Sequence, residues 1–307
     1  MPLALSTSWN AFRHRSGTNI AKEINQLGFR HIELSFNLTP HILKGLAQGS
    51  RKLGLRINSL HNYCPIPSGF SRKEALPDCY SLASLDKEER SIAVKYTKLS
   101  IDTAARLNSS AVVLHCGRVQ IEDRTKALIR LYREGCLKTK DFTSLKSEYI
   151  KERELKGRPY FFSALKSIDE LGCYADKKKI KLGIETRFYY REIPCFDEIS
   201  EILNRFRGSN IGYWHDTGHA QLLEDLSFSR HKDFLDSYSG RMIGIHLHDI
   251  KNCQDHLCPG QGKINFSFLR RYLRKETLKV IEAHYPASPE NLSKAKEYLE
   301  NELKGLL

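Results

Sequence analysis

Eight short apolar segments that alternate with longer amphipathic ones constrain the fold most strongly. The segments that we interpret as strands cover residues 3–8, 31–36, 56–61, 111–116, 182–186, 211–216, 242–249 and 279–284. Several are apolar almost throughout, as expected for strands of a parallel sheet that is covered on both faces. Helical patterns lie between or after them, at residues 19–28, 39–54, 87–108, 162–179, 196–206, 266–273 and 288–304. Eight strands alternating with helices predict an α/β protein with a (β/α)8 TIM barrel.

A doubly wound open sheet is the alternative architecture. It predicts a glycine-rich phosphate-binding turn after the first strand, and the sequence STSWNAFRHRSG does not have that pattern. The chain has 307 residues, and α/β barrels of roughly 250 residues form one domain. We therefore expect a single barrel domain over residues 1–307.

Two long interruptions follow predicted strands three and four. Residues 62–85 form a loop, and residues 120–158 form a highly charged segment that we predict to be a helical insertion. Both leave from the carboxyl ends of strands, where barrel enzymes build their active sites. The insertion fits a lid, a dimer contact, a basic arm or a solvated helix, and its Glu and Asp residues, which interrupt any basic patch, favour the solvated helix.

The composition limits the class of protein. The formal net charge is +13, but basic stretches such as 177–181 and 270–275 are scattered, so nucleic acid is a less favoured partner than a small, phosphorylated substrate. No run approaches roughly 18 apolar residues, and the N-terminus has no signal-peptide pattern. The eight cysteines lack close pairing and indicate reduced thiols. We expect a cytoplasmic protein without a membrane span, which could form a homo-oligomer.

Imidazoles and carboxylates recur at the carboxyl ends of the predicted strands. They are Glu33, His61, His115, Glu185, Asp216, His219, His246, His248, Asp249, Glu282 and His284, with Asp255 and His256 in the loop after strand seven. Such groups would be costly to desolvate together without a cation, so their convergence predicts a divalent metal site. Strand alternation places His215 on the opposite face from Asp216, so we interpret His215 as structural. Trp214 fits either an apolar wall of the site or the core between barrel and helices.

Seven motifs spread over nearly the whole chain resemble one family. They are SLHNY (59–63), VVLHCG (112–117), GIETR (183–187), HDTGHA (215–220), IHLHD (245–249), DHLCPGQGKINF (255–266) and VIEAH (280–284). Together they resemble the xylose isomerase-like barrels, which include sugar epimerases, inosose dehydratase-type lyases and endonuclease IV.

The resemblance implies a metal site and a reaction. The metal ligands would be Glu185, Asp216, His246 and Glu282, holding Mn, Mg, Co or Zn. Glu185 and Glu282 would also act as acid and base in an isomerase, epimerase or dehydratase of a sugar, sugar phosphate or polyol. The candidate substrate contacts are Glu33, Arg187, Glu192, His219 and His248.

Two alternative functions stay open. The resemblance to endonuclease IV implies that His61, His115, His219, Asp255 and His256 hold further zinc ions for phosphodiester cleavage of abasic DNA. The same side chains could instead bind sugar hydroxyl groups. The second alternative is a non-catalytic barrel that binds a partner through residues 120–158.

Overall fold

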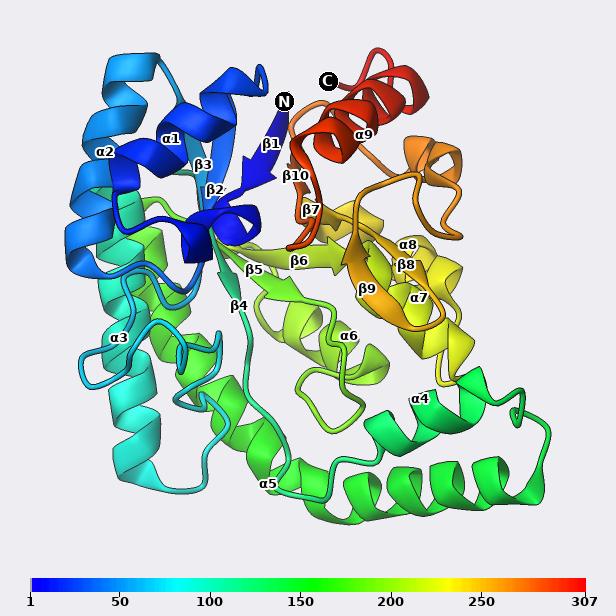
Figure 1. The fold of residues 1–307 in the computed structure, drawn as a ribbon. Coiled ribbons are helices and arrows are strands. Elements are labelled where there is room, and N and C mark those ends of the chain that lie inside the picture. The colour runs from blue at the N-terminus through cyan, green and yellow to red at the C-terminus, as the bar shows by residue number, and fades with distance from the viewer. Residues whose placement is uncertain (1) are drawn as a thin grey trace.

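The computed structural model describes residues 2–307 as a closed, parallel, eight-stranded barrel (Figure 1). Its strands are β1 (Leu3–Ser6), β2 (His31–Leu34), β3 (Arg56–His61), β4 (Ala111–Leu114), β5 (Lys181–Glu185), β6 (Ile211–Asp216), β7 (Met242–Leu247) and β10 (Leu278–Ile281). Neighbours in the chain are neighbours in the barrel, and β10 closes it against β1. Each of the eight predicted strands is present, so the (β/α)8 prediction is confirmed.

Helices surround the barrel. The α-helices are α1 (Gly17–Gln26), α2 (Pro40–Leu53), α3 (Lys87–Arg106), α4 (Thr125–Arg133), α5 (Lys140–Lys178), α6 (Phe196–Arg205), α7 (Thr217–Asp225), α8 (His231–Tyr238) and α9 (Pro289–Glu302). Short 3-10 helices are η1 (Thr7–Trp9), η2 (Ala11–Arg13), η3 (Ser239–Arg241) and η4 (Phe266–Arg271). Helix α2 shows how local sequence sets the ends: Thr39 accepts a hydrogen bond from the Ile42 N–H, and Gly54 closes the helix at a φ of 68°.

Two helical predictions differ from the structure, and two helices were not predicted. The segment 162–179 is not a separate helix but the second half of the 39-residue helix α5, which passes through Pro159. A proline there removes one backbone hydrogen bond, to the carbonyl of Leu155, and that residue is exposed and can bond to water instead. The predicted helix at 266–273 is the 3-10 helix η4. The sequence analysis also missed α7 and α8.

The charged insertion, residues 120–158, is helical as predicted. It contains α4 and the first half of α5, which run side by side and project from the barrel at the lower edge of Figure 1. We call this segment the arm. The second half of α5 returns along the barrel beside α3, where Lys98 Nζ lies 2.6 Å from Glu170 Oε1.

Two apolar clusters form the core. The larger one lies between the outer face of the barrel and the helices. The smaller one fills the barrel and consists of Ala4, Ala111, Val113, Trp214, Leu278 and Val280. Trp214 therefore lies inside the barrel, and not in the core between barrel and helices. A Cβ at Gly244 would lie 2.1 Å from its ring, and one at Gly183 would lie 2.7 Å away, so the indole needs glycine on both neighbouring strands.

A hairpin that the sequence did not reveal follows β7. Its antiparallel strands are β8 (Asp249–Lys251) and β9 (Gln254–Leu257), so the predicted seventh strand ends at Leu247. The buried Asp249 carboxylate accepts backbone hydrogen bonds from Ile250, Gly260, Gly262 and Ile264 at 2.8–3.0 Å. This one side chain therefore fixes the glycine loop that follows the hairpin.

Within residues 2–307, none of the helices has the length and apolar composition needed to cross a membrane. All eight cysteines of this range are free thiols, as the sequence indicates.

Candidate metal centre

Four side chains from four adjacent strand ends meet at one point. Glu185 ends β5, Asp216 ends β6, His246 lies in β7 and Glu282 follows β10. His246 Nδ1 lies 2.7 Å from Glu185 Oε1, 2.9 Å from Glu282 Oε2 and 3.6 Å from Asp216 Oδ2. All four residues are buried, and one ligand atom of each lies within 4.8 Å of the others. The structure thus brings together the four residues that the sequence predicts as metal ligands.

The chemistry of this donor set fits a divalent cation. Three buried carboxylates face one imidazole, and burial raises a carboxyl pKa unless positive charge compensates it. Burial alone would raise the pKa of Glu185, Asp216 and Glu282, but the surrounding imidazoles outweigh it and hold all three well below their ordinary values. Burial alone would lower the pKa of His246, yet Glu282 and Glu33 raise it well above the ordinary value. A metal ion at this point would supply the charge and free Nδ1 to ligate, and mixed N and O donors suit Mn, Co or Zn.

Glu33 orients the imidazole of His246. Its carboxylate is fully buried on β2, accepts a hydrogen bond from Ser59 Oγ at 2.8 Å and lies 3.1 Å from His246 Nε2. Because a carboxylate accepts, Nε2 carries the proton and Nδ1 faces the three acidic ligands. Glu33 does not reach the cavity described below, so the geometry favours a positioning role over substrate contact.

His248 positions Asp216 in a similar way. Its Nδ1 accepts the backbone N–H of His256 at 3.0 Å, so its Nε2 carries the proton and donates to Asp216 Oδ1 at 2.9 Å. Both ring nitrogens are engaged and the residue is fully buried. The geometry therefore places His248 behind the site and not against a substrate.

Three further histidines share a ligand-ready arrangement. In His61, His219 and His256, Nδ1 lies 2.8–3.1 Å from an oxygen of Asn62, Thr186 and Asp255 respectively. These oxygens are acceptors, so each Nδ1 is a donor and Nε2 is the remaining nitrogen. All three residues line the cavity at the mouth of the barrel. The burial that lowers the pKa of His256 is outweighed by Asp255, which raises it to about 9.

His61 and His115 gather at the second oxygen of Glu185. His115 Nε2 lies 2.7 Å and His61 Nε2 lies 3.9 Å from Glu185 Oε2. The two rings meet edge to face at 4.8 Å, and the Nδ1 of His115 is buried without a hydrogen-bond partner. Burial and the neighbouring Arg187 lower the pKa of His115 well below its ordinary value, so the ring is neutral. These residues could hold a second cation with Glu185 as the bridge.

His284, which the sequence places at the end of the eighth strand without a specific role, is a further wall residue of the cavity. It follows Glu282 by two positions, and side chains two positions apart in an extended segment point to the same face. Its ring stacks on His256 at 3.8 Å with an interplanar angle of 12°. The lone pairs of parallel rings lie in separate planes, so we do not assign one ion to this pair. Burial and His256 lower the pKa of His284 to about 3.

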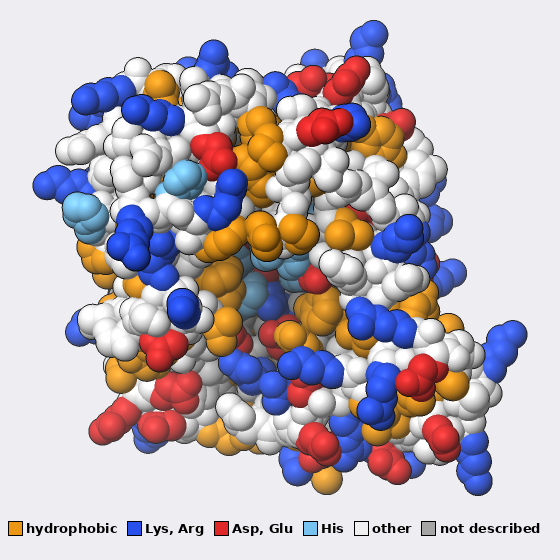
Figure 2. Space-filling model, viewed as in Figure 1, with side chains coloured by type: hydrophobic (Ala, Val, Ile, Leu, Met, Phe, Trp, Pro, Cys, Tyr) orange, Lys and Arg blue, Asp and Glu red, His pale blue; other side chains and the backbone are white. Residues whose placement is uncertain are grey.

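The cavity above the metal ligands has a volume of about 510 Å³. Its lining consists of Phe36, His61, Leu76, Pro77, Asp78, His115, Arg118, Asp123, Lys126, Glu185, Arg187, Phe188, Tyr189, Arg191, Glu192, His219, Asp255, His256, Glu282 and His284. Figure 2 shows the hollow near the centre of this face, with histidine side chains at its base and lysine and arginine side chains below it. Arg187 and Glu192, both predicted substrate contacts, are paired there at 3.3 Å.

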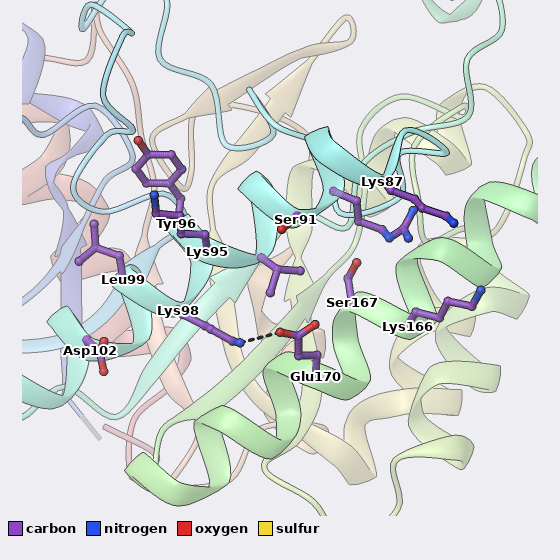
Figure 3. Close-up of a pocket in the computed structure, with 12 residues that line it drawn as sticks. Lys87, Ser91, Lys95, Tyr96, Lys98, Leu99, Asp102, Lys166, Ser167 and Glu170 are labelled. Atoms are coloured by element: carbon purple, nitrogen blue, oxygen red, sulfur yellow. Dashed lines mark hydrogen bonds and ion pairs between the residues drawn. The ribbon is translucent and has the colours of Figure 1, made fainter.

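A groove of about 620 Å³ lies elsewhere, between α3 and α5 on the outside of the barrel (Figure 3). Its wall carries lysines such as Lys87, Lys95 and Lys166, and the Lys98–Glu170 ion pair crosses it. None of the clusters of candidate metal ligands found within residues 2–307 includes a residue of this groove. The distribution of candidate ligands therefore favours the cavity at the barrel mouth, and not this groove, as the functional site.

The outward-facing histidines are structural. His215 lies outside the barrel, as strand alternation predicts, with Nδ1 2.7 Å from the Tyr213 hydroxyl and Nε2 2.9 Å from His231 Nε2. His14 pairs with Glu23, and His31 bonds to Asn58. These side chains have local partners and none lines the cavity.

Sequence comparisons connect this geometry to known proteins. The family model described as "Xylose isomerase-like TIM barrel" matches residues 156–302. An uncharacterized protein of Sinorhizobium fredii is 24% identical over 184 residues, covering 60% of this chain and 49% of that protein. An uncharacterized protein of Methanocaldococcus jannaschii is 26% identical over 190 residues, covering 60% of this chain and 53% of that protein. These matches span about half the length of each relative.

Solved structures resemble the whole chain. A D-tagatose 3-epimerase-like protein has 20% identity and a TM-score of 0.64, covering 100% of this chain and 98% of that one. The 3-keto-D-glucoside 4-epimerase of E. coli has 14% identity and a TM-score of 0.68, with coverage of 98% and 99%. D-psicose 3-epimerase of Clostridium cellulolyticum H10 has 14% identity and a TM-score of 0.69, covering 99% of each chain. At these identities the likeness establishes the shared fold.

Proposed function

We propose that this xylose isomerase-like TIM barrel is a divalent-metal-dependent enzyme that isomerises or epimerises a sugar, a sugar phosphate or a related polyol. The observation that carries the proposal is a division among the four candidate ligands. Glu185 and Glu282 line the cavity, whereas Asp216 and His246 lie behind it and are fully buried. Two of the ligands can therefore reach a substrate, and both are carboxylates. The fold shared with two sugar epimerases and a D-tagatose 3-epimerase-like protein supports the same class of substrate.

A bound divalent cation would supply Lewis-acid polarisation of a substrate carbonyl. Glu185 and Glu282 then provide the proton transfer. Because their pKa values are lowered, both are ionised at neutral pH, and either can accept a proton from the carbon next to the carbonyl. The C–H electron pair moves into an enediolate. The glutamate that accepted the proton can return it to the same or the neighbouring carbon, and the opposite glutamate can deliver one only after it has taken a proton from solvent. Return from the opposite face inverts the carbon, and return to the neighbour completes an isomerisation.

Side chains around the two glutamates hold them in place. Arg187 Nη1 lies 2.5 Å and His115 Nε2 lies 2.7 Å from Glu185 Oε2. His256 Nε2 lies 4.0 Å from Glu282 Oε2. The Arg187–Glu192 pair and the Nε2 of His219 offer donors and acceptors for sugar hydroxyl groups.

The test is solvent deuterium exchange into candidate sugars and sugar phosphates by the metal-loaded protein. Glu185→Gln and Glu282→Gln should each abolish exchange, since an amide cannot accept the proton, while the fold is retained by circular dichroism. His215→Gln, outside the barrel, is the matched control and should retain exchange. Persistent exchange in both glutamine variants would exclude the two-carboxylate mechanism.

A second candidate function is a multinuclear phosphodiesterase that cleaves abasic DNA. The observation that favours it is the pair of His61 and His115 beside the second oxygen of Glu185, because chemistry with a single metal ion does not require these ligands. Metal analysis separates the two functions. A single ion per chain supports the sugar enzyme, whereas two or three zinc ions together with cleavage of abasic DNA support the phosphodiesterase.

A further inference from the structure

We propose that the arm gives the cavity an anion-binding edge, so that the substrate carries a phosphate group at the end remote from the metal ligands. That the bound phosphate belongs to a substrate rests on the proposed function, but the anion-binding edge is a site that can be tested by itself. Four basic residues line the cavity: Arg118, Lys126, Arg187 and Arg191. Lys126 comes from the arm, and Arg118 and Arg191 come from loops beside it, whereas Arg187 lies two residues after Glu185 at the end of β5.

The arm is fixed against the loop that follows β5. The Tyr190 N–H lies 3.3 Å from Thr125 Oγ1, at the start of α4. The Arg191 N–H donates to the Tyr149 hydroxyl at 3.2 Å, and Arg191 Nη1 donates to the Ile121 carbonyl at 3.0 Å. The start of α4 is therefore part of the cavity wall.

Arg153 provides a second, buried connection. It lies on α5, and its guanidinium donates to the carbonyls of Tyr190 and Glu192 at 2.8 and 2.9 Å. The same group forms a two-point pair with Glu198 at 2.8 and 3.2 Å. A buried, bidentate arginine of this kind holds the arm and the Glu192 loop in one arrangement.

The four cations differ in how far the protein neutralises them. Arg118 pairs with Asp78 at 3.1 Å, and Arg187 pairs with Glu185 and Glu192. Among residues 2–307, Lys126 and Arg191 form no ion pair, and the Nε of Arg191 is buried without a hydrogen-bond partner. Positive charge without an ion-pair partner is therefore available on this wall of the cavity.

Two arginines on the outer surface of the arm, unlike Lys126 and Arg191, form ion pairs. Arg124 pairs with Glu122, Glu148 and Glu152 at 3.3–3.4 Å, and Arg158 pairs with Glu201 at 2.8 Å. These pairs neutralise Arg124 and Arg158. The cavity is also acidic at its base. A single phosphate group on a small molecule therefore fits this edge better than a polyanion, which would also meet Asp78, Asp123 and Asp255.

The test is calorimetric titration of the full-length, metal-loaded protein with inorganic phosphate at low ionic strength. Loss of one charged hydrogen bond costs roughly tenfold in affinity, so Lys126→Gln should weaken phosphate binding by about that factor. Lys126→Arg should restore it. Lys151→Gln removes the same charge from an exposed position of α5 in the arm, outside the lining, and is the matched control.

Three results would overturn the proposal: no phosphate binding by the wild-type protein, unchanged binding in Lys126→Gln, or equal weakening in Lys126→Gln and Lys151→Gln. Equal weakening in both variants would indicate a general effect of surface charge, as expected for a surface that binds DNA. Unchanged binding in Lys126→Gln would be the result if phosphate bound only to the metal. If Lys126→Gln loses affinity but no sugar or sugar phosphate exchanges deuterium, the edge stands and the proposed function fails.

Discussion

The Nε2 of His246 lies 3.1 Å from Glu33 Oε1, and this contact decides which nitrogen of His246 faces the three acidic ligands. With Nε2 protonated toward Glu33, Nδ1 is the nitrogen left for a cation. A residue that the sequence suggested as a substrate contact thus orients a candidate metal ligand.

Replacing Glu33 by leucine should weaken metal binding roughly 10- to 100-fold, because the ring loses the acceptor that fixes its tautomer. Glu33→Gln keeps a carbonyl oxygen for Nε2 and should cause a much smaller loss. Competition with a fluorescent chelator measures both affinities. Wild-type affinity in Glu33→Leu would show that the contact does not orient His246.

Metal should stabilise the fold, because the four ligands converge only in the native state. At a free metal concentration 100 times Kd, the free energy of unfolding should rise by about 2.7 kcal/mol. Thermal unfolding with added Mn, Co or Zn, and after chelation, measures this gain. Asp216→Asn replaces a buried ligand and should remove most of the metal-dependent shift, whereas Lys151→Gln should retain it. A shift of the same size in Asp216→Asn would contradict the assigned site.

The sequence predicts the barrel and the convergence of its ligands for one physical reason. Parallel strands of a closed barrel present their carboxyl ends on one face, so Glu185, Asp216, His246 and Glu282 had to meet once the strands were recognised. Alternation likewise placed His215 outside. These inferences need only local pattern and topology.

Other features depend on contacts that the sequence does not encode locally. Helix α7 begins at Thr217 with Asp216 as its N-cap, so the ligand motif occupies the first turn and hides the helical pattern. The role of His248 depends on the backbone N–H of His256, which a hairpin brings to it. Lys126 lines the cavity only because the start of α4 packs against the loop that follows β5. In each case, a tertiary contact between distant segments sets the role of the residue.

Asp249 should be a major stabilising residue of the mouth. Its carboxylate accepts four backbone N–H groups. Asp249→Asn would remove the charge from the acceptor of all four and leave about half of them facing an NH2 group with no acceptor. We expect a loss of roughly 3 kcal/mol in the free energy of unfolding, measured by urea denaturation.

Gly262→Ala should also destabilise the protein, since the new Cβ would lie 2.3 Å from Asp249 Oδ1. Gly240→Ala, with open space around it, is the control, and equal effects at both glycines would refute this account.

His231 should make the fold less stable in mild acid. Burial lowers the pKa of this histidine to about 4, whereas an unfolded histidine titrates near roughly 6.5. Between these values the unfolded chain binds more protons than the native one, so the free energy of unfolding falls as pH drops from about 6.5 toward 4. The full contribution is up to about 3 kcal/mol. The groups facing the ring are His215 from β6, Gln221 from α7 and Phe268 from η4, while Glu224 accepts the backbone N–H.

His231→Gln removes this titration, so its stability should change less between pH 7.5 and 5 than that of the wild-type protein. Urea denaturation at both pH values measures the difference, with His41→Gln, an exposed histidine, as control. An identical pH dependence in wild-type and His231→Gln proteins would mean that the buried imidazole does not set the acid sensitivity.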